Sequence, residues 1–217
     1  MKITEVKALY VPLLFVLIIA PMTLAAADDS RYELSGRLNL MGATGEPTND
    51  ILGFGVMLHR QLSDDWYLGF SVEHSAEFDV ERPNEKLDID SVSETDAVGS
   101  MTMLTAVAER RYAMESSNWT WFWNLGLGVA DYDFDNAEGD IEGGGSFDIK
   151  VEADTETVLL GGIGLMQHLG ENWSARYELG FEQHFADWKV TDEVTGATDS
   201  YDDFTVTGAR LGLNYRF

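Results

Sequence analysis

The sequence contains no cysteine. Disulfides, thiol nucleophiles and cysteine-ligated metals are therefore excluded, and so is attachment of a lipid to an N-terminal cysteine. The absence of cysteine is only weakly informative about compartment, because many proteins outside the cytoplasm also lack it.

Basic residues are scarce. The 14 lysines and arginines are outnumbered by 38 aspartates and glutamates, for a formal net charge of −24 at pH 7. Binding to nucleic acid depends on lysine and arginine contacts with phosphates, so a surface this acidic argues against DNA or RNA as a partner.

Long apolar runs are also lacking, apart from one at residues 8–20. Lys2 and Lys7 give this end a basic character, and Ala25 to Ala27 provide a small-residue cleavage site, so residues 1–27 are predicted to be a secretory signal peptide. An uncleaved N-terminal anchor is the alternative, although the run is short of the about 20 residues that a spanning helix needs. Residues 28–217 form one predicted domain, which could cross a membrane only as a closed barrel.

What the chain does contain is short segments in which apolar residues alternate with small or polar ones. In residues 204–217, Ala209, Leu211, Leu213, Tyr215 and Phe217 share one face, opposite small and polar residues. A tilted strand of about ten residues is long enough to cross a bilayer core. Similar segments occur at 32–41, 51–61, 66–78, 98–112, 119–130, 157–169 and 173–186, and the facing of 98–112 and of 157–169 is ambiguous. The predicted fold is all-β, an eight-stranded antiparallel up-and-down transmembrane β-barrel.

The links between these segments alternate in length. Those at 62–65, 113–118 and 170–172 are short, whereas those at 43–50, 79–97, 131–156 and 187–203 are long, polar and acidic. Outer-membrane barrels have short periplasmic turns and longer external loops. The pattern therefore predicts acidic external loops and places both ends of the barrel domain on the periplasmic side.

The inward faces of the predicted strands carry charges of both signs in near balance. Charges inside a narrow barrel need partners, because moving a charged side chain out of water without a partner of opposite sign costs free energy. We therefore predict a lumen charge network of Glu33, Arg37, Glu73, Glu109, Arg111, Arg176, Glu178, Glu182, Arg210 and Arg216, with Glu77 also facing inward. These side chains, with Tyr67 and Phe122, should fill a barrel of this size.

Aromatic residues mark one end of the predicted strands. Trp66, Trp119 and Trp173 each follow a short turn, and Tyr112 ends a strand at the same level. This arrangement is typical of the aromatic girdle of a membrane barrel. With the C-terminal segment Leu211 to Phe217, it makes residues 31–217 resemble the small eight-stranded outer-membrane barrels, a group that includes the OmpA membrane domain and OmpX. The resemblance implies an outer-membrane location in a Gram-negative bacterium after signal-peptide cleavage. It also implies contact with outer-membrane lipid and lipopolysaccharide, and recognition of Phe217, supported by Tyr215, by the barrel assembly machinery.

The sequence leaves several functions open. A structural, surface-interaction or cation-binding role is favoured, with an unknown external partner and no catalytic residues or required cofactor. Calcium or magnesium could bind the acidic loops. Asp131, Asp133, Asp135 and Glu142 have the spacing of an EF-hand-like loop, but Asn136 replaces its usual glycine, and a solvated acidic segment is the simpler interpretation.

Two alternatives remain. One is a lipid-modifying enzyme using His74 and Ser75, or His184 near Glu182, although Ala186 stands where a His-x-Ser pattern would need serine. The other is a narrow solute channel through inward glycines such as Gly53, Gly126 and Gly162. Those glycines would otherwise serve to relieve crowding inside the sheet.

Overall fold

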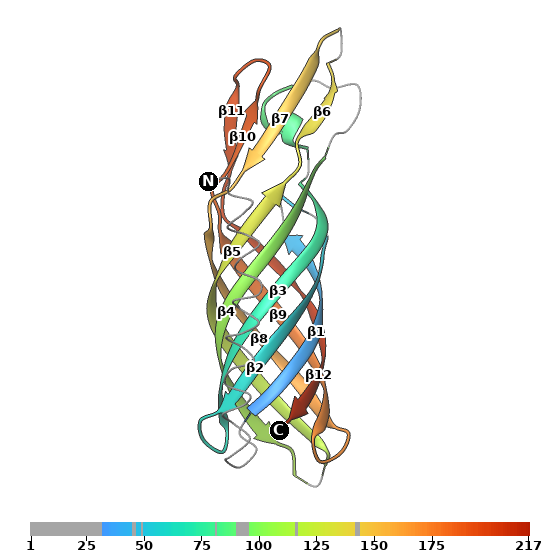
Figure 1. Cartoon of the computed structure of the whole chain (residues 1–217), viewed down its shortest axis with the longest axis vertical. Coiled ribbons are helices and arrows are strands. Elements are labelled where there is room, and N and C mark those ends of the chain that lie inside the picture. The colour runs from blue at the N-terminus through green and yellow to red at the C-terminus, as the bar shows by residue number, and fades with distance from the viewer. Residues whose placement is uncertain are drawn as a thin grey trace.

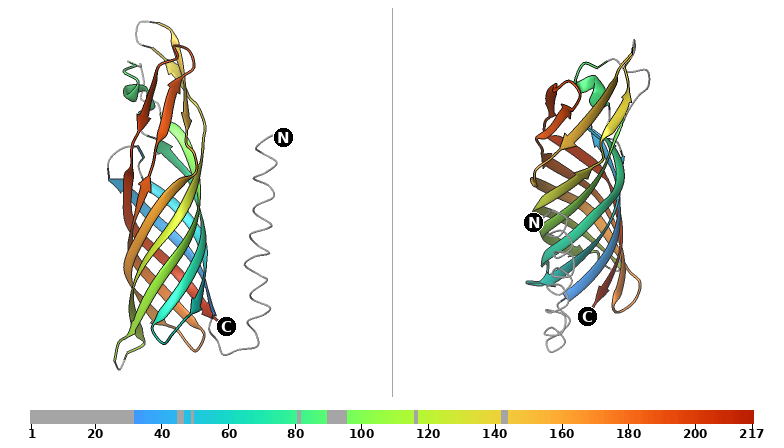
Figure 2. Two further views of the ribbon diagram at one scale, coloured as in Figure 1. Left: turned by 90° about the vertical axis from the view of Figure 1, so that its left-hand side faces the viewer. Right: turned by 45° about the horizontal axis from the view of Figure 1, so that its top comes forward.

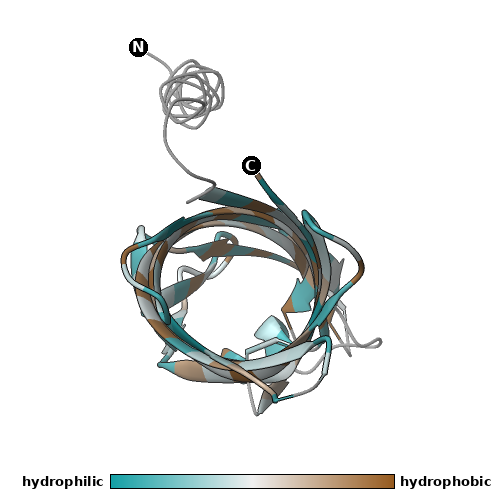
Figure 3. Cartoon of the chain, turned by 90° about the horizontal axis from the view of Figure 1, so that it is seen from below, coloured by the Kyte–Doolittle hydropathy of each residue, from teal (hydrophilic) through white to brown (hydrophobic). Residues whose placement is uncertain are grey.

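The predicted eight-stranded barrel is confirmed. The computed structural model describes residues 32–44, 47–48, 50–80, 82–89, 96–115, 117–141 and 144–217, so the predicted signal peptide lies outside the described part. The antiparallel strands, labelled in Figure 1, close in the order β1-β12-β9-β8-β5-β4-β3-β2, and Figure 3 shows the closed ring from one end. Their bounds are β1 (Tyr32–Thr44), β2 (Asp50–Gln61), β3 (Trp66–Val80), β4 (Ala97–Ala113), β5 (Trp119–Phe134), β8 (Glu156–His168), β9 (Trp173–Phe185) and β12 (Phe204–Arg216). Within the described residues, no helix is long and apolar enough to cross a bilayer.

The barrel closes where its first and last strands meet. β1 pairs with β12 from Glu33 opposite Arg216 to Thr44 opposite Thr205, without a register shift. This seam is needed because hydrocarbon cannot hydrogen-bond the backbone groups of an open sheet edge.

The alternation of the sequence becomes an outer wall and an inner wall. Outward side chains such as Leu38, Phe70 and Leu179 are 55%, 58% and 65% exposed, while inward residues are buried. The facing that the sequence left ambiguous is now defined on β8, where Val158 and Leu160 point inward and Ile163 and Leu165 point outward. A continuous apolar outer wall is the surface that lipid contacts.

The height of this wall matches a bilayer. Its upper edge is a polar row, His74 on β3, Thr102 on β4 and Asp131 on β5, which are neighbours across the sheet. Tyr112 marks the aromatic lower end of β4, about ten residues from Thr102. At about 3.3 Å per residue and a tilt of about 40°, the distance between them is about 25 Å, the usual height of the apolar band. The upper parts of β3, β4 and β5 therefore extend beyond the apolar band.

Two of the four links predicted to be acidic external loops, 131–156 and 187–203, contain regular structure. They form β6 (Ala137–Asp140), β7 (Ser146–Glu152), β10 (Trp188–Asp192) and β11 (Thr198–Tyr201), which pair in the order β11-β10-β7-β6. This four-stranded sheet, here called the upper sheet, stands above the barrel (Figure 2). Another long link, 79–97, contributes the short helix α2 (Pro83–Lys86).

The upper sheet is held by an apolar core that continues into the barrel mouth. Trp188 is fully buried, with its ring centroid 4.9 Å from those of Tyr132 and Phe134 and 5.1 Å from that of Phe204. Other members of this cluster come from inward faces of the barrel strands and from the inner face of the upper sheet, including Met41, Phe78, Met101, Phe147, Ile149 and Val206. The upper sheet is thus packed onto the barrel rather than joined to it only by chain connections.

A buried carboxylate ties β7 to β10. Asp192 accepts hydrogen bonds from the backbone amides of Asp148 and Val194, and from the hydroxyl of Thr195 at 2.5 Å. Burial raises the pKa of Asp192, but these hydrogen bonds outweigh it, so the pKa lies below its ordinary value. Asp192 therefore stays ionised and fixes the turn between β10 and β11.

We expect Trp188→Ala to loosen the upper sheet while leaving the barrel closed. Removing a buried tryptophan side chain typically costs about 3–5 kcal/mol, and here the loss falls on the apolar core between sheet and barrel. In refolded protein, trypsin should then cleave after Lys150 and Lys189, whereas the barrel strands stay protected. Val194→Ala is the control, because Val194 is 59% exposed. Equal protease resistance of the two variants would contradict this account of the core.

Candidate functional site

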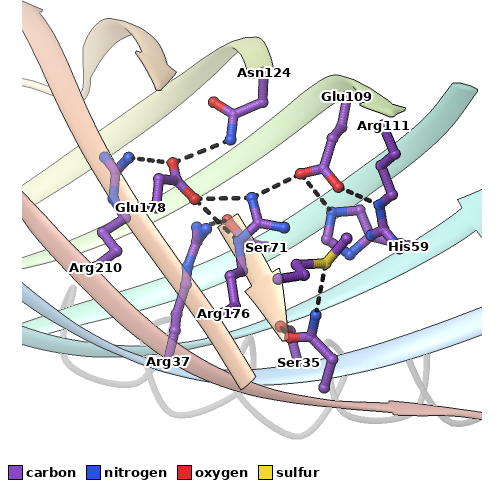
Figure 4. A network of polar contacts seen from close by, with 12 residues as sticks. Ser35, Arg37, His59, Ser71, Glu109, Arg111, Asn124, Arg176, Glu178 and Arg210 are labelled. Carbon is purple, nitrogen blue, oxygen red and sulfur yellow. Dashed lines mark hydrogen bonds and ion pairs between the residues drawn. The ribbon is translucent and has the colours of Figure 1, made fainter. Parts of the chain in front are cut away.

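The inner wall of the barrel carries a continuous chain of ion pairs. Near the lower end of the strands, Arg111 contacts Glu33 at 2.8 Å and Glu109 at 2.6 Å. Arg176 then bridges Glu109 at 2.6 Å to Glu178 at 2.8 Å. Each arginine is therefore shared by two carboxylates that come from different strands, and Figure 4 shows Arg176 between Glu109 and Glu178.

The chain continues toward the barrel mouth. Arg210 contacts Glu178 at 2.9 Å and Glu182 at 2.5 Å. Glu182 lies 3.3 Å from Nε2 of His184, and Nδ1 of that ring is 2.6 Å from the hydroxyl of Tyr132. The polar chain thus ends against the apolar core that carries the upper sheet.

A second group lies on β1 and β3. Arg37 pairs with Glu73, which also accepts a hydrogen bond from Asn39. Arg37 donates to the hydroxyl of Ser71 at 3.1 Å, and that hydroxyl is 2.6 Å from the Thr105 hydroxyl. All these side chains are buried, so their charges are compensated by the protein rather than by bulk water.

Aromatic rings and glycines complete the filling. The guanidinium of Arg111 lies 3.7 Å from the Tyr67 ring centroid, and that of Arg176 lies 3.8 Å from the Phe122 centroid. A Cβ at Gly162 would come 2.6 Å from Oε1 of Glu178, and one at Gly55 would come 2.6 Å from Cγ of Glu73. These inward glycines therefore make room for network side chains.

Two sequence assignments differ from the structure. Glu77 is exposed, because a register shift between Ser75 and Phe78 turns it outward and Phe78 inward. Arg216 lies opposite Glu33 at the open end of β12, is only partly buried, and takes part in none of the ion pairs recorded among the described residues. The other nine predicted members are brought together in the lumen.

The structure also adds residues that the charge pattern did not reveal. His59 is fully buried, 3.8 Å from Glu33 and 3.7 Å from Glu109, while Asn124 donates to Glu178 at 3.0 Å. Their inward position in the alternation was the available signal. The sequence already placed His184 near Glu182, but the contact of His184 with Tyr132 depends on strand pairing.

The EF-hand-like spacing does not form a loop. Asp131 and Asp133 are exposed residues of β5, alternating with the inward Tyr132 and the partly buried Phe134, and Asp135 follows the strand. Glu142 lies outside the described residues. In the part of the chain that the structure describes, no group of three or more histidine, aspartate or glutamate side chains is arranged to hold a metal ion.

The side chains considered for lipid modification are separated. His74 faces outward, 3.1 Å from the Thr102 hydroxyl, whereas Ser75 is buried on the inner face. The ring nitrogens of His184 contact the Tyr132 hydroxyl and the Glu182 carboxylate, and Phe204 stacks on the ring with 4.6 Å between ring centroids. No hydrogen bond recorded among the described residues joins either histidine to a serine.

Aromatic side chains encircle the lower end of the outer wall. Trp66 packs on Trp123 at 5.5 Å, Tyr112 on Trp121 at 4.2 Å, and Trp119 on Tyr177 at 6.2 Å between ring centroids. The ring continues through Trp173 and Tyr215 at 4.8 Å, and Phe217 lies 6.3 Å from both Tyr215 and Tyr32. The predicted girdle residues and the C-terminal pair therefore lie at one level.

The architecture is that of the small eight-stranded outer-membrane β-barrels. The chain is similar in structure to a major outer membrane protein of Thermus thermophilus (TM-score 0.54, 13% identity, 86% of this chain and 99% of that chain). It is also similar to Neisserial surface protein A (TM-score 0.52, 12% identity, 87% and 98%) and to the outer membrane protein OprG of Pseudomonas aeruginosa (TM-score 0.51, 12% identity, 86% and 95%). At these identities the likeness shows the fold alone. No protein-family model matches the sequence, and no curated protein matches it.

Arg176→Met should strongly destabilise the barrel. It leaves Glu109 and Glu178 buried without their shared cation, and breaking a buried ion pair in this way costs about 3–5 kcal/mol. Urea unfolding of the refolded protein in detergent micelles, followed by tryptophan fluorescence, measures the loss. Lys150→Met is the control, because its pair with Glu152 is solvent-exposed and should contribute little. The triple variant R176M/E109Q/E178Q should recover part of the loss. Equal stability of R176M and K150M would contradict the role of the network.

Proposed function

We propose that the protein is an integral outer-membrane barrel with a side-chain-filled lumen, serving as a rigid base that presents the acidic upper sheet at the cell surface. The observation that carries this proposal is the combination of an apolar outer wall with an inner wall of paired charges. A soluble β-sandwich would place its aliphatic side chains inside instead. The outer-membrane fold of the structural neighbours supports the same location.

The filled lumen argues for a presenting role rather than general diffusion. The lower half of the interior holds the charge network, and the upper half holds the apolar cluster beneath Trp188. By resemblance to small outer-membrane barrels, Phe217 and Tyr215 serve as the signal read by the barrel assembly machinery. Outer-membrane lipid and lipopolysaccharide are then the molecules that contact the outer wall.

In planar lipid bilayers, we expect the refolded protein to give no steady conductance, because both halves of its lumen are occupied. Insertion is checked separately by the shift in gel mobility between unheated and boiled samples. Stable current steps that scale with potassium chloride concentration would instead support the narrow-channel alternative.

The upper sheet is expected to bind cationic partners through its acidic surface. Exposed carboxylates of this region include Glu138, Asp140, Asp199, Asp202 and Asp203. Short polylysine should bind the protein in nanodiscs with an affinity that falls as salt rises, because exposed charges are screened. The variant D199N/D202N/D203N should bind severalfold more weakly than the wild type. Binding that is insensitive to both salt and these substitutions would exclude an electrostatic interaction.

A further inference from the structure

Two arginines stand apart from the charge network. In the described barrel strands, the arginines in outward-facing positions are Arg60 and Arg110. The side chains of Arg37, Arg111, Arg176 and Arg210 are instead buried inside the barrel. Arg60 and Arg110 occur close to the lower ends of their strands, which are Gln61 on β2 and Ala113 on β4. They therefore lie at the level of the aromatic girdle, where lipid headgroups begin.

Register brings the two arginines into one patch. Arg60 is opposite Leu68 on β3, and Trp66, two residues before Leu68, is opposite Arg110. Two strand spacings together with the offset of two residues along the strands separate the two arginine Cα atoms by about 12 Å, a distance that two arginine side chains can span around one headgroup. The patch consists of Arg60, Arg110, Tyr32, Trp66 and Tyr112, and is called the girdle arginine patch.

Aromatic rings orient both guanidinium groups. The Arg110 guanidinium lies 5.5 Å from the Trp66 centroid and 5.0 Å from the Tyr112 centroid, and Arg60 lies 5.9 Å from that of Tyr32. A guanidinium over a ring keeps its N–H groups in its own plane, where they remain free to donate. Such a planar fork matches the oxygen atoms of a phosphate.

The neighbouring carboxylate leaves the fork of Arg110 available. Asp65 accepts the hydrogen bond of Arg110 Nε at 2.8 Å, and this pair is partly exposed. The bond uses Nε and fixes the plane of the group. Among the hydrogen bonds recorded for the described residues, none uses the two terminal nitrogens of Arg110. The orienting carboxylate and the donor face are therefore on different edges of the guanidinium.

We propose that the girdle arginine patch binds the phosphate headgroup of an anionic phospholipid in the periplasmic leaflet. This inference rests on the proposed outer-membrane function, since it needs the lower end of the wall to lie at a headgroup layer. Charge complementarity carries it: two outward cations meet at the girdle in a chain whose net charge is −24. The rings contact the glycerol and upper acyl region, while the arginines hold the phosphate.

Native mass spectrometry of the detergent-solubilised protein tests the site with phosphatidylglycerol as the probe and phosphatidylcholine as the neutral comparison. We expect one tight phosphatidylglycerol adduct. In R60Q/R110Q its affinity should fall on the order of tenfold, as expected for two cations at a lipid headgroup. The matched control is K150Q/K189Q, which removes the same charge from the upper sheet and should leave binding unchanged.

Three outcomes would overturn the site: equal binding of the two lipids, undiminished binding by R60Q/R110Q, or displacement of the lipid by millimolar inorganic phosphate, which would identify a free-anion site. The single variants R60Q and R110Q, each expected to lose part of the affinity, provide the same test if the double variant does not fold. Failure of the proposed function is distinguishable, because the wild-type chain would then stay folded in buffer without detergent. A barrel that inserts but shows no lipid preference contradicts only the site.

Discussion

The closing of β1 onto β12 is the constraint on which the rest of the structure depends. In hydrocarbon every backbone donor and acceptor needs a protein partner, and a sheet can provide that only without free edges. Once eight strands are closed into a ring, the interior is just wide enough for side chains. Every inward residue must then be compatible with its neighbours across a narrow space.

The ion pairs inside are a consequence of that narrowness. Arg176 does not simply neutralise one carboxylate; it is shared by Glu109 and Glu178, and Glu178 is shared in turn with Arg210. The network side chains therefore occupy space inside the barrel, and Gly162 lies where any side chain would collide with Glu178.

Period-two alternation made the barrel predictable, because side-chain direction in a strand follows directly from chain position. The strands and nine members of the network could be read from this pattern. Glu77 could not, because one bulge between Ser75 and Phe78 reverses the facing, and nothing in the local alternation marks it. Arg216 has the inward position in the alternation but stands at the open end of β12, where a side chain is only partly enclosed.

The upper sheet was hidden for a different reason. β6, β7, β10 and β11 are each four to seven residues long, and their polar outer residues, such as Glu138, Asp140 and Asp199, resemble those of solvated loops. Their stability comes from pairings such as Val190 with Val151, which are distant in the sequence, and from Trp188 packing over the barrel mouth. Contacts of this kind appear only when the barrel strands have brought the links together.

The two ends of the barrel differ in chemistry in a way that fits the proposed orientation, with the upper sheet at the cell surface. At the upper edge of the apolar wall, Asp131 and the exposed carboxylates above it face outward, so an anionic lipid layer there needs cations between protein and lipid. At the lower edge, Arg60 and Arg110 face outward among aromatic rings and can contact phosphate directly. Interfacial side chains of this kind resist displacement along the bilayer normal, because the rings and guanidinium groups are most stable at the headgroup level. Burial of the acidic upper sheet in hydrocarbon is unfavourable, and the girdle residues favour the headgroup level at the lower end of the barrel. Together these two preferences fix the height of the upper sheet above the membrane.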